Sequence, residues 1–315
     1  MQKNRLMWGE KPYHSLDYEM KQRFGEKVYK IALDGGMTCP NRDGTIGRKG
    51  CIFCSGNGSG DFASPICESV TKQIDQGIAG IRSRKTVGKR FIAYFQSFTN
   101  TYAPVERLRQ LYKEALSHPD VAVLSIATRP DCINHEVLSL LEECNQIKPV
   151  MVELGLQTIH EETARFIRRG YPLSVFDAVL RELKQRQIET VVHVISGLPL
   201  ENKQKFCETI EYLSEKSIDG IKLQLLHVLK NTDLAFYLGS PKLHILEKEE
   251  YFEQIAAALC LLPPETVIHR LTGDGPKESL LAPLWSSRKR EVLNELHRYL
   301  KENKIWQSKE YHYAK

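Results

Sequence analysis

Short runs of apolar and β-branched residues alternate along the chain with longer amphipathic stretches. Most of the short runs are continuously apolar, as strands buried on both faces of a sheet should be. They predict six strands, at 28–33, 90–95, 121–127, 149–155, 190–196 and 220–226. The amphipathic stretches predict helices at 69–82, 105–116, 135–144, 174–187 and 203–216. This alternation predicts an α/β fold with right-handed crossovers and a mainly parallel sheet, open or curled toward a barrel.

Each predicted strand is followed by an unusual polar string. In chain order these strings are DGGMTCPNRDG, QSFTNTY, TRPD, LQT, GLP and HVLKNTD. In parallel α/β folds the loops after the carboxyl ends of the strands carry the chemistry, so we expect the functional site there. No internal repeat or low-complexity linker divides the chain, which favours one domain with extensions.

Composition and charge narrow the class of protein. The 315 residues are 42% hydrophobic, enough for a large core. No apolar run reaches signal-peptide length at the N-terminus or the roughly 20 residues of a membrane span, which predicts a soluble cytoplasmic protein. A net charge of +5 permits a polyanionic partner without demanding one. Basic residues gather at 82–90 and 286–304, and each cluster is either a solvated surface or part of a groove for nucleic acid.

Three of the eight cysteines, Cys39, Cys51 and Cys54, lie in one glycine-rich loop with the spacing C-x11-C-x2-C. Clustered thiols in a reducing compartment bind metal more often than they pair. A structural zinc ion and an electron-transfer iron–sulfur cubane both take four protein ligands. Three thiolates leave one iron without a protein ligand, and an open position allows a metal centre to bind and transform a small molecule. The other five cysteines are predicted to be small buried residues.

The loop ends in CIFC, a Cys-x-aromatic-Cys motif, and five more βα units follow it. Together with the strings YFQSFTNTYAPVE, ATRPDCI, VELGLQT, LQLLHVLKNTDLA and RLTGDGPKESLLAPLW, these features resemble the radical S-adenosylmethionine (SAM) superfamily, in the branch that contains the Elongator catalytic subunit and the YhcC/YtqA-like proteins. The resemblance implies a partial (β/α)6 TIM-like barrel of the radical SAM type over residues 25–262, with an N-terminal extension, 1–24, and a C-terminal extension, 263–315.

The resemblance also implies the cofactors. Cys39, Cys51 and Cys54 would hold a [4Fe–4S] cluster whose free iron binds SAM, and an electron from a donor such as flavodoxin or ferredoxin would cleave SAM to a 5′-deoxyadenosyl radical. The positions that match or replace the family's SAM contacts are Phe53, Gln96, Ser97, Thr99, Thr128, Gln157, Arg169 and His193.

The chain departs from the family pattern at two of these positions. The usual glycine pair after the second strand is Gln96-Ser97, whose backbone carbonyls would take its place. The usual glutamate before Arg-Pro is Ala127, so its contact is lost or comes from Thr128. His193 lies inside an apolar strand and is either a cofactor contact or a satisfied core histidine.

Elongator-type enzymes add a side chain at carbon 5 of the wobble uridine in tRNA. This chain lacks an acetyltransferase domain, which favours remodelling of an existing side chain, from 5-carboxymethylaminomethyl-uridine to 5-aminomethyl-uridine, with the anticodon stem-loop of tRNA as the partner. The candidate substrate residues are Lys222, Gln224, His227, His269, Arg270 and Asp274. Arg270 is expected either to bind a carboxylate or phosphate or to pair with Asp274. The alternatives are radical chemistry on a peptide or small metabolite, and a non-catalytic metal-binding regulator of nucleic acid.

Overall fold

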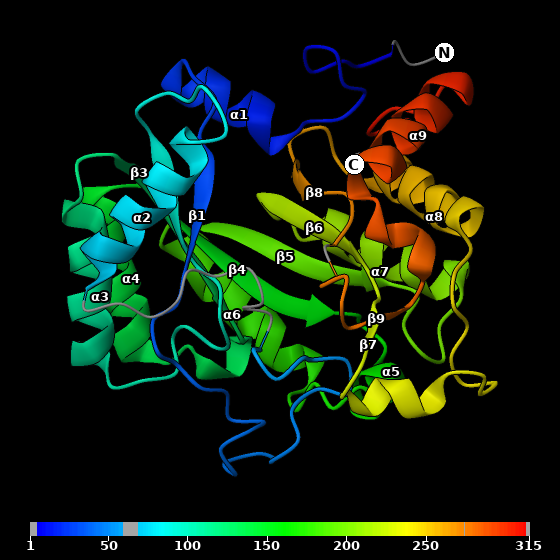
Figure 1. Ribbon diagram of the computed structural model, residues 1–315, viewed down its shortest axis with the longest axis horizontal. Coiled ribbons are helices and arrows are strands. Elements are labelled where there is room, and N and C mark those ends of the chain that lie inside the picture. Colours follow the sequence, from blue (N-terminus) through cyan, green and yellow to red (C-terminus); the bar gives the residue numbers. More distant parts are fainter. Residues whose placement is uncertain (1–4, 59–68, 274, 313–315) are drawn as a thin grey trace.

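Seven parallel strands form a curved sheet at the centre of the computed structural model, which describes residues 5–58, 69–273 and 275–312 (Figure 1). The strands are β1 Tyr29–Leu33, β2 Phe91–Phe95, β3 Val121–Thr128, β4 Val150–Gln157, β5 Glu189–Ser196, β6 Gly220–Leu225 and β8 Val267–Arg270. Their spatial order is β1-β2-β3-β4-β5-β6-β8, so the sheet curls without closing. This partial barrel confirms the predicted fold class, and the six predicted strands all lie within two residues of their predicted bounds.

The seventh strand, β8, lies in the segment predicted to be a C-terminal extension. It pairs with β6 in parallel, with Gly220 opposite Val267 and Ile221 opposite Ile268. The sequence VIHR is four residues long, too short a run for its hydrophobic pattern to assign it to the sheet. The extension therefore contributes one strand to the barrel.

The chain's N-terminal segment covers the free edge of β8. The backbone N–H of Ile268 donates to the carbonyl of His14 at 2.6 Å, and Ser15 forms a parallel bridge with Ile268. Gln307, near the other end of the chain, holds this segment in place. Its backbone N–H donates to the carbonyl of Pro12 at 2.8 Å, and its side-chain oxygen accepts from the N–H of His14 at 2.8 Å.

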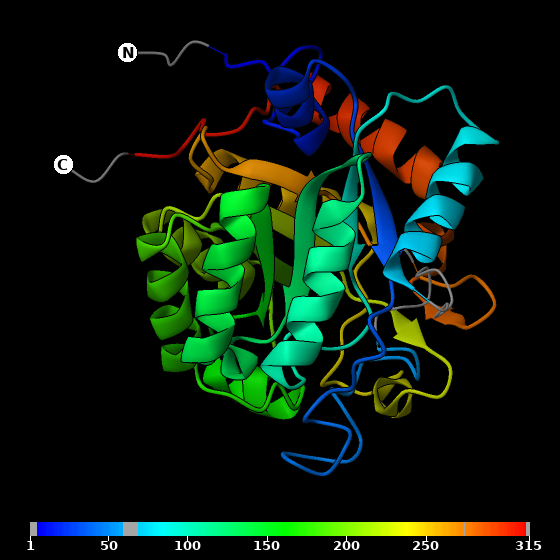
Figure 2. The ribbon, with the colours of Figure 1, turned by 90° about the vertical axis from the view of Figure 1, so that its left-hand side faces the viewer.

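Helices cover the outer face of the sheet, and Figure 2 shows those from the middle of the chain standing side by side on it. The helices are α1 Leu16–Phe24, α2 Val70–Arg82, α3 Val105–Ser117, α4 His135–Ile147, α5 Glu161–Phe166, α6 Leu173–Gln185, α7 Lys203–Glu215, α8 Lys248–Leu261 and α9 Lys289–Glu302. The five predicted helices are α2, α3, α4, α6 and α7. Short 3-10 turns occur at Pro130–Cys132, Asp233–Tyr237 and Leu284–Ser287, and β7 Val228–Leu229 pairs with β9 Leu280–Ala282 in a small antiparallel sheet. None of the helices in the described part of the chain is long and apolar enough to cross a membrane.

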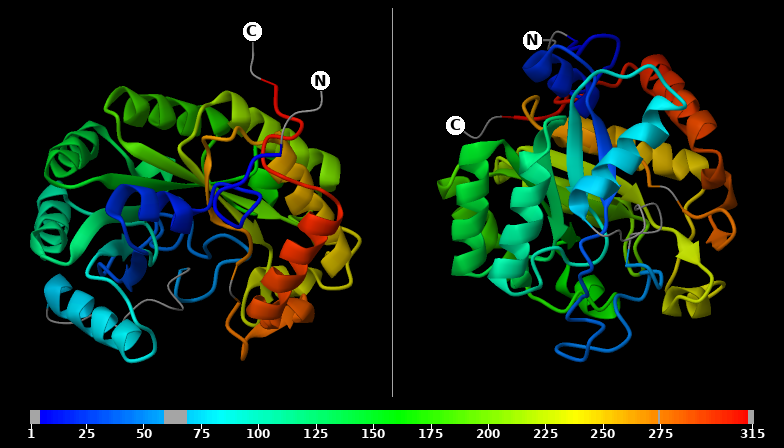
Figure 3. Two further views of the ribbon diagram at one scale, coloured as in Figure 1. Left: turned by 90° about the horizontal axis from the view of Figure 1, so that it is seen from above. Right: turned by 60° about the vertical axis from the view of Figure 1, so that its left-hand side comes forward.

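Side chains alternate between the two faces of each strand, and β2 shows this clearly. Phe95 points outward and packs on Tyr112 of α3, with ring centroids 5.6 Å apart. Ile92 and Tyr94 belong instead to the inner cluster of the barrel, together with Met20 of α1. Seen from above in Figure 3, α1 lies over the amino ends of the strands. One end of the barrel is therefore closed by α1, which leaves the carboxyl ends of the strands as the place for a site.

A candidate cluster and cofactor site

The glycine-rich loop after β1 brings the three clustered cysteines to one cavity at the carboxyl ends of the strands. Cys39, Cys51 and Cys54 line this cavity of about 160 Å³, which we call the cysteine cavity. A turn joins two of them, because the N–H of Cys54 donates to the carbonyl of Cys51 at 3.0 Å. Gly50, at φ +72°, precedes Cys51, and a Cβ there would lie 2.9 Å from Nε of Arg42. The loop therefore requires glycine at this position.

The donor chemistry fits an iron–sulfur cluster. All three thiols are free and half-buried. Burial, with the neighbouring Cys54 and Cys39, raises the pKa of Cys51 to about 12, so this sulfur holds its proton until a metal displaces it. Within residues 5–58, 69–273 and 275–312, no three Cys, His, Asp or Glu side chains converge as a single metal ion requires. A cluster places each thiolate on a different iron, so its three thiolates need not converge on one ion.

The four other cysteines that the structure describes are not part of the lining of the cysteine cavity. Cys144 and Cys260 are buried, which confirms the prediction for these two, while Cys132 and Cys207 are only half-buried. Cys67 lies outside the described residues.

Most of the predicted cofactor contacts also line the cysteine cavity. The seven that do are Phe53, Gln96, Thr99, Thr128, Gln157, Arg169 and His193. Ser97 is 1% exposed and is not part of the lining, so its expected role rests on its backbone carbonyl. These contacts stay predictions, but the fold gathers residues from five separate strands or their loops around the thiols.

Gln157 reaches the cavity through a distortion of β4. Its φ is +65°, in the left-handed region that residues other than glycine rarely adopt. The pairing between β4 and β5 shifts register between Gly155 and Gln157. Backbone strain of this kind is commonly kept where function requires it, and it supports a binding role for Gln157.

Arg169 borders the cavity, but most of its N–H groups are already bonded. Its guanidinium donates to the carbonyls of Tyr171 at 3.0 Å, Leu156 at 3.3 Å and Thr158 at 2.6 Å, and to Glu161 Oε1 at 3.1 Å. The side chain is 1% exposed. Arg169 therefore fixes the loop after β4, and a contact with the SAM carboxylate, which stays a prediction, would use the N–H capacity that remains.

Arg129 is a cavity residue that the sequence did not single out. It lines the cysteine cavity, lies 5.2 Å from the ring centroid of Tyr171, and binds Asp131 through Nε at 3.0 Å and Nη2 at 2.7 Å. Its charge acts on Cys39 and Cys51. The signal for it was the polar string TRPD after the third strand, and its position favours the binding of negatively charged thiolates.

A buried ionic network lies at the inner end of the cavity, centred on Glu153 of β4, which is 1% exposed. Glu153 Oε1 accepts from Lys30 Nζ and from Ser125 Oγ, each at 2.7 Å. Glu153 Oε2 accepts from His193 Nε2 at 2.8 Å and from Lys222 Nζ. Burial alone would raise the pKa of Glu153, but the two ammonium groups hold it well below its usual range. The carboxylate is therefore ionised and fully bonded.

The network reaches the cavity lining through two further side chains. Lys222 Nζ donates to the hydroxyl of Tyr94 at 3.0 Å, and Gln224 Nε2 lies 3.3 Å from His193 Nδ1. Because the amide nitrogen of Gln224 donates, His193 Nδ1 accepts and its Nε2–H donates to Glu153. His193 is thus both a satisfied histidine and part of the cavity lining, so the two expectations for it do not exclude each other.

The network predicts a stability loss in mild acid. Burial and the nearby Lys222 lower the pKa of His193 from 6.5 to about 4. Between these values the unfolded chain binds a proton that the folded chain does not, so stability rises with pH and is lost as pH falls. His193 is expected to lower the free energy of unfolding by about 3 kcal/mol near pH 4, relative to neutral pH. Urea unfolding at pH 7.0 and pH 4.5 measures it, and His193→Gln should show a smaller difference between the two conditions.

His244→Gln is the matched control for this measurement, because the His244 side chain is 63% exposed. It should keep the pH dependence of the wild type. An unchanged pH dependence in His193→Gln would contradict the assignment.

The structure divides the predicted substrate residues into two groups. Lys222, Gln224 and Arg270 line the cysteine cavity, and His227 lines an adjoining cleft of about 180 Å³ that also includes Gln224 and Arg270. His269 lines two other cavities, beside α1 at the amino end of the barrel. Asp274 lies outside the described residues.

The basic cluster at 82–90 precedes β2 and so lies at the amino ends of the strands, opposite the cysteine loop. Arg82 pairs with Asp120 at 3.3 Å, and Arg90 pairs with Glu26 at 3.6 Å. This placement favours a solvated surface over a groove that serves the site. In the other cluster, Lys289 begins α9 and lines a cavity that also contains Lys222 and Arg270.

Comparisons with known proteins agree with this geometry. The sequence pattern of the radical SAM superfamily matches residues 42–213, and that of the radical SAM C-terminal domain matches residues 218–302. The chain is 42% identical over 300 residues to YtqA of Bacillus subtilis, covering 95% of this chain and 93% of YtqA. It is 38% identical over 288 residues to YhcC of Escherichia coli K12, covering 91% and 92% of the two chains. The solved structure of Elp3 from Methanocaldococcus infernus has a TM-score of 0.67 at 15% identity, over 89% of this chain and 64% of that one, so it shares the fold.

Proposed function

The chain belongs to the radical SAM superfamily and is an enzyme that uses a [4Fe–4S] cluster and SAM, and from this premise we propose that it remodels the side chain at carbon 5 of the wobble uridine in tRNA. The reaction is the conversion of 5-carboxymethylaminomethyl-uridine to 5-aminomethyl-uridine. Membership in an enzyme family excludes a purely regulatory metal-binding protein. The resemblance to the Elongator branch supports a tRNA substrate.

The observation that carries the proposal is the position of Arg270. Its guanidinium lines both the cysteine cavity and the adjoining cleft. Within the described part of the chain it forms no ion pair or hydrogen bond, although Lys222 and Lys30 beside it are both bonded to Glu153. A guanidinium at this position is well suited to receive a carboxylate, which it binds through two parallel hydrogen bonds.

The proposed chemistry takes place at the methylene group between the carboxylate and the amine. When bound, the cluster and SAM would supply a 5′-deoxyadenosyl radical, a species able to accept one hydrogen atom from this carbon. Loss of one electron to a carrier such as oxidised flavodoxin or ferredoxin, together with loss of the N–H proton to water, then gives an imine. Water adds to the imine carbon, and cleavage of the carbon–nitrogen bond releases glyoxylate and leaves the aminomethyl group on the uridine.

The chain's own residues position the substrate in this scheme. Arg270 holds the carboxylate, and Lys222 keeps the inner end of the cavity positive while it stays bonded to Glu153. Gln224 and His227 line the cleft in which the unpaired base would lie, beside the cysteine cavity.

Mass spectrometry of tRNA nucleosides tests the function directly. Cells without the protein should accumulate 5-carboxymethylaminomethyl-uridine and lose 5-aminomethyl-uridine, and the wild-type gene should restore the balance. Arg270→Gln should lower kcat/KM roughly 10- to 100-fold, because it removes a charged hydrogen-bonding partner of the substrate. The control Arg84→Gln, in the loop at the opposite end of the barrel, should restore the wild-type pattern. Unchanged wobble nucleosides in the deletion strain would end the tRNA proposal and leave the family assignment standing.

A further inference from the structure

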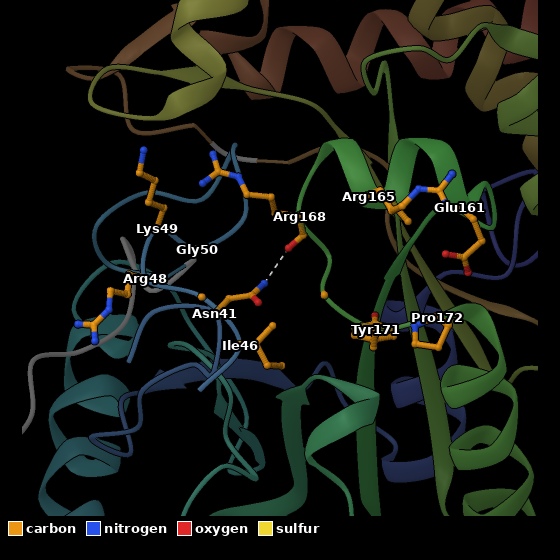
Figure 4. Close-up of a pocket in the computed structure, with 13 residues that line it drawn as sticks. Asn41, Ile46, Arg48, Lys49, Gly50, Glu161, Arg165, Arg168, Tyr171 and Pro172 are labelled. Carbon is orange, nitrogen blue, oxygen red and sulfur yellow. Dashed lines mark hydrogen bonds between the residues drawn. The ribbon is translucent and has the colours of Figure 1, made fainter. Parts of the chain in front are cut away.

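A second pocket adjoins the cysteine loop, and Arg270 is not part of its lining. It measures about 580 Å³ and is formed by the cysteine loop and by α5 with the turn that follows it. Its basic side chains are Arg48, Lys49, Arg165 and Arg168, and Figure 4 shows them around the pocket. We call it the basic pocket. No step of the reaction described above uses it.

Most of its positive charge is available to a partner. Arg48, Lys49 and Arg165 are exposed and form no ion pair within the described part of the chain. Glu161, the acidic residue in the lining, accepts from Arg169 and from the backbone N–H of Leu173, and Asp233 pairs with Arg168. An acidic surface would therefore meet three cations that form no ion pair with the residues the structure describes.

The floor of the basic pocket is in direct contact with a predicted cluster ligand. Asn41 Nδ2 lies 3.6 Å from Cys51 Sγ and donates to the carbonyl of Arg168 at 2.7 Å. The thiol of Cys51 lies 3.5 Å from the same carbonyl. Gly50 and Tyr171 line both this pocket and the cysteine cavity. One layer of residues thus separates a molecule in the basic pocket from the sulfur of Cys51.

We propose that the basic pocket is the docking site of an acidic one-electron carrier protein, a flavodoxin or a ferredoxin, that reduces the cluster. Electron transfer weakens steeply with distance, so the carrier must approach where few atoms cover the cluster. Such encounters use small interfaces and are guided by charge complementarity. The proposal depends on the radical chemistry of the family and is independent of the tRNA substrate.

The lining of the basic pocket favours a protein over RNA. Single-stranded RNA binds where exposed aromatic rings stack on its bases. Tyr171, the aromatic residue in this lining, is 7% exposed, and its hydroxyl is bonded to the carbonyl of Gly155. Ile46 is instead 48% exposed at the rim. An apolar contact surrounded by cations is typical of protein–protein docking.

Charge reversal with a matched control tests the proposal. Arg48→Glu/Lys49→Glu changes the pocket, and Arg84→Glu/Lys85→Glu makes the same change of charge at the amino end of the barrel. With oxidised flavodoxin or ferredoxin as the probe, the pocket variant of the holoenzyme should lose at least tenfold in affinity at low salt for one of the two carriers, and the control should lose little. The same variant should make 5′-deoxyadenosine slowly with the reduced carrier but at the wild-type rate with dithionite, which needs no docking site. The two carriers, measured separately, show which one the pocket serves.

Arg165→Glu on α5 provides an independent variant if the loop variant fails to hold its cluster, and it should weaken carrier binding several-fold. Unchanged affinity of the pocket variants for both carriers would overturn the proposal. An equal loss in the control would also overturn it, because the effect would then be one of net charge alone. Loss of tRNA binding with unchanged carrier binding would assign the pocket to RNA instead. None of these outcomes depends on which nucleoside the enzyme modifies.

Discussion

Replacing Cys51 by alanine is expected to abolish both the iron–sulfur cluster and SAM cleavage. Three thiols line the cysteine cavity, and each would bind one iron. Removing one leaves two anchors and a second iron without a protein ligand, so the variant should lose its visible cluster absorbance. Formation of 5′-deoxyadenosine from SAM under reducing conditions should fall by roughly a thousandfold or more. Anaerobic reconstitution, followed by iron and sulfide analysis, measures the first effect.

Cys132→Ala is the matched control for this experiment. Cys132 is a half-buried thiol near Cys39 whose neighbours include Arg129 and Asp131, yet it is not part of the cavity lining. The control should retain the full cluster and full SAM cleavage. If Cys51→Ala kept the cluster absorbance, or if Cys132→Ala lost it, the three-thiol site would be wrong.

Replacing Glu153 by alanine is expected to cost about 3–5 kcal/mol of folding free energy, because it leaves Lys222 and Lys30 as positive charges without their carboxylate. Lys222 is 3% exposed, so water cannot readily replace the lost partner. Urea unfolding at pH 7 measures the difference. Glu106→Ala, whose side chain is 74% exposed, should change stability by less than about 0.5 kcal/mol.

A double variant separates the ion pair from general loss of packing. Glu153→Gln/Lys222→Met should cost clearly less than the sum of Glu153→Gln and Lys222→Met measured singly, because Lys222 is then no longer a buried charge without its carboxylate and only the less buried Lys30 loses its partner. If the costs were additive, Glu153 and Lys222 would contribute independently to the free energy of unfolding. That result would contradict the ion pair between them in the structure.

The strands could be predicted because their sequences fit few structures other than a buried strand. A continuously apolar run of strand length between helical stretches, such as VAVLSIA, fits a buried parallel strand. A short apolar strand before His269 could be recognised, but the place of β8 in the sheet could not, because its register is set by β6 and by the N-terminal segment, neither of which is local in sequence. The sequence leaves residues 82–90 as either a solvated surface or part of a groove, and their position before β2 places them at the end of the barrel opposite the cysteine loop.

Part of the site could also be predicted, because some of its residues follow a local sequence pattern. The cysteine spacing is a local signal, so Cys39, Cys51 and Cys54 were recognisable without a structure. The network around Glu153 joins residues of six strands, and it depends on which inward-facing side chains lie at the same level of the barrel. Sequence alternation shows that a residue points inward, but the level follows from strand register. The partners of Glu153, and the position of His269 outside the cysteine cavity, could therefore be identified only from the structure.

The N-terminal segment also protects the edge strand of the open sheet. An open sheet ends in a strand with unpaired backbone groups, and these can recruit a strand from a second molecule. Here the carbonyl of His14 accepts a hydrogen bond from the N–H of Ile268. Gln307, near the other end of the chain, holds the same segment in place. Detachment of residues 12–15, by a protease or by a bulky fusion, would expose the unpaired backbone groups of β8. These residues therefore protect the enzyme from edge-to-edge association with a second copy.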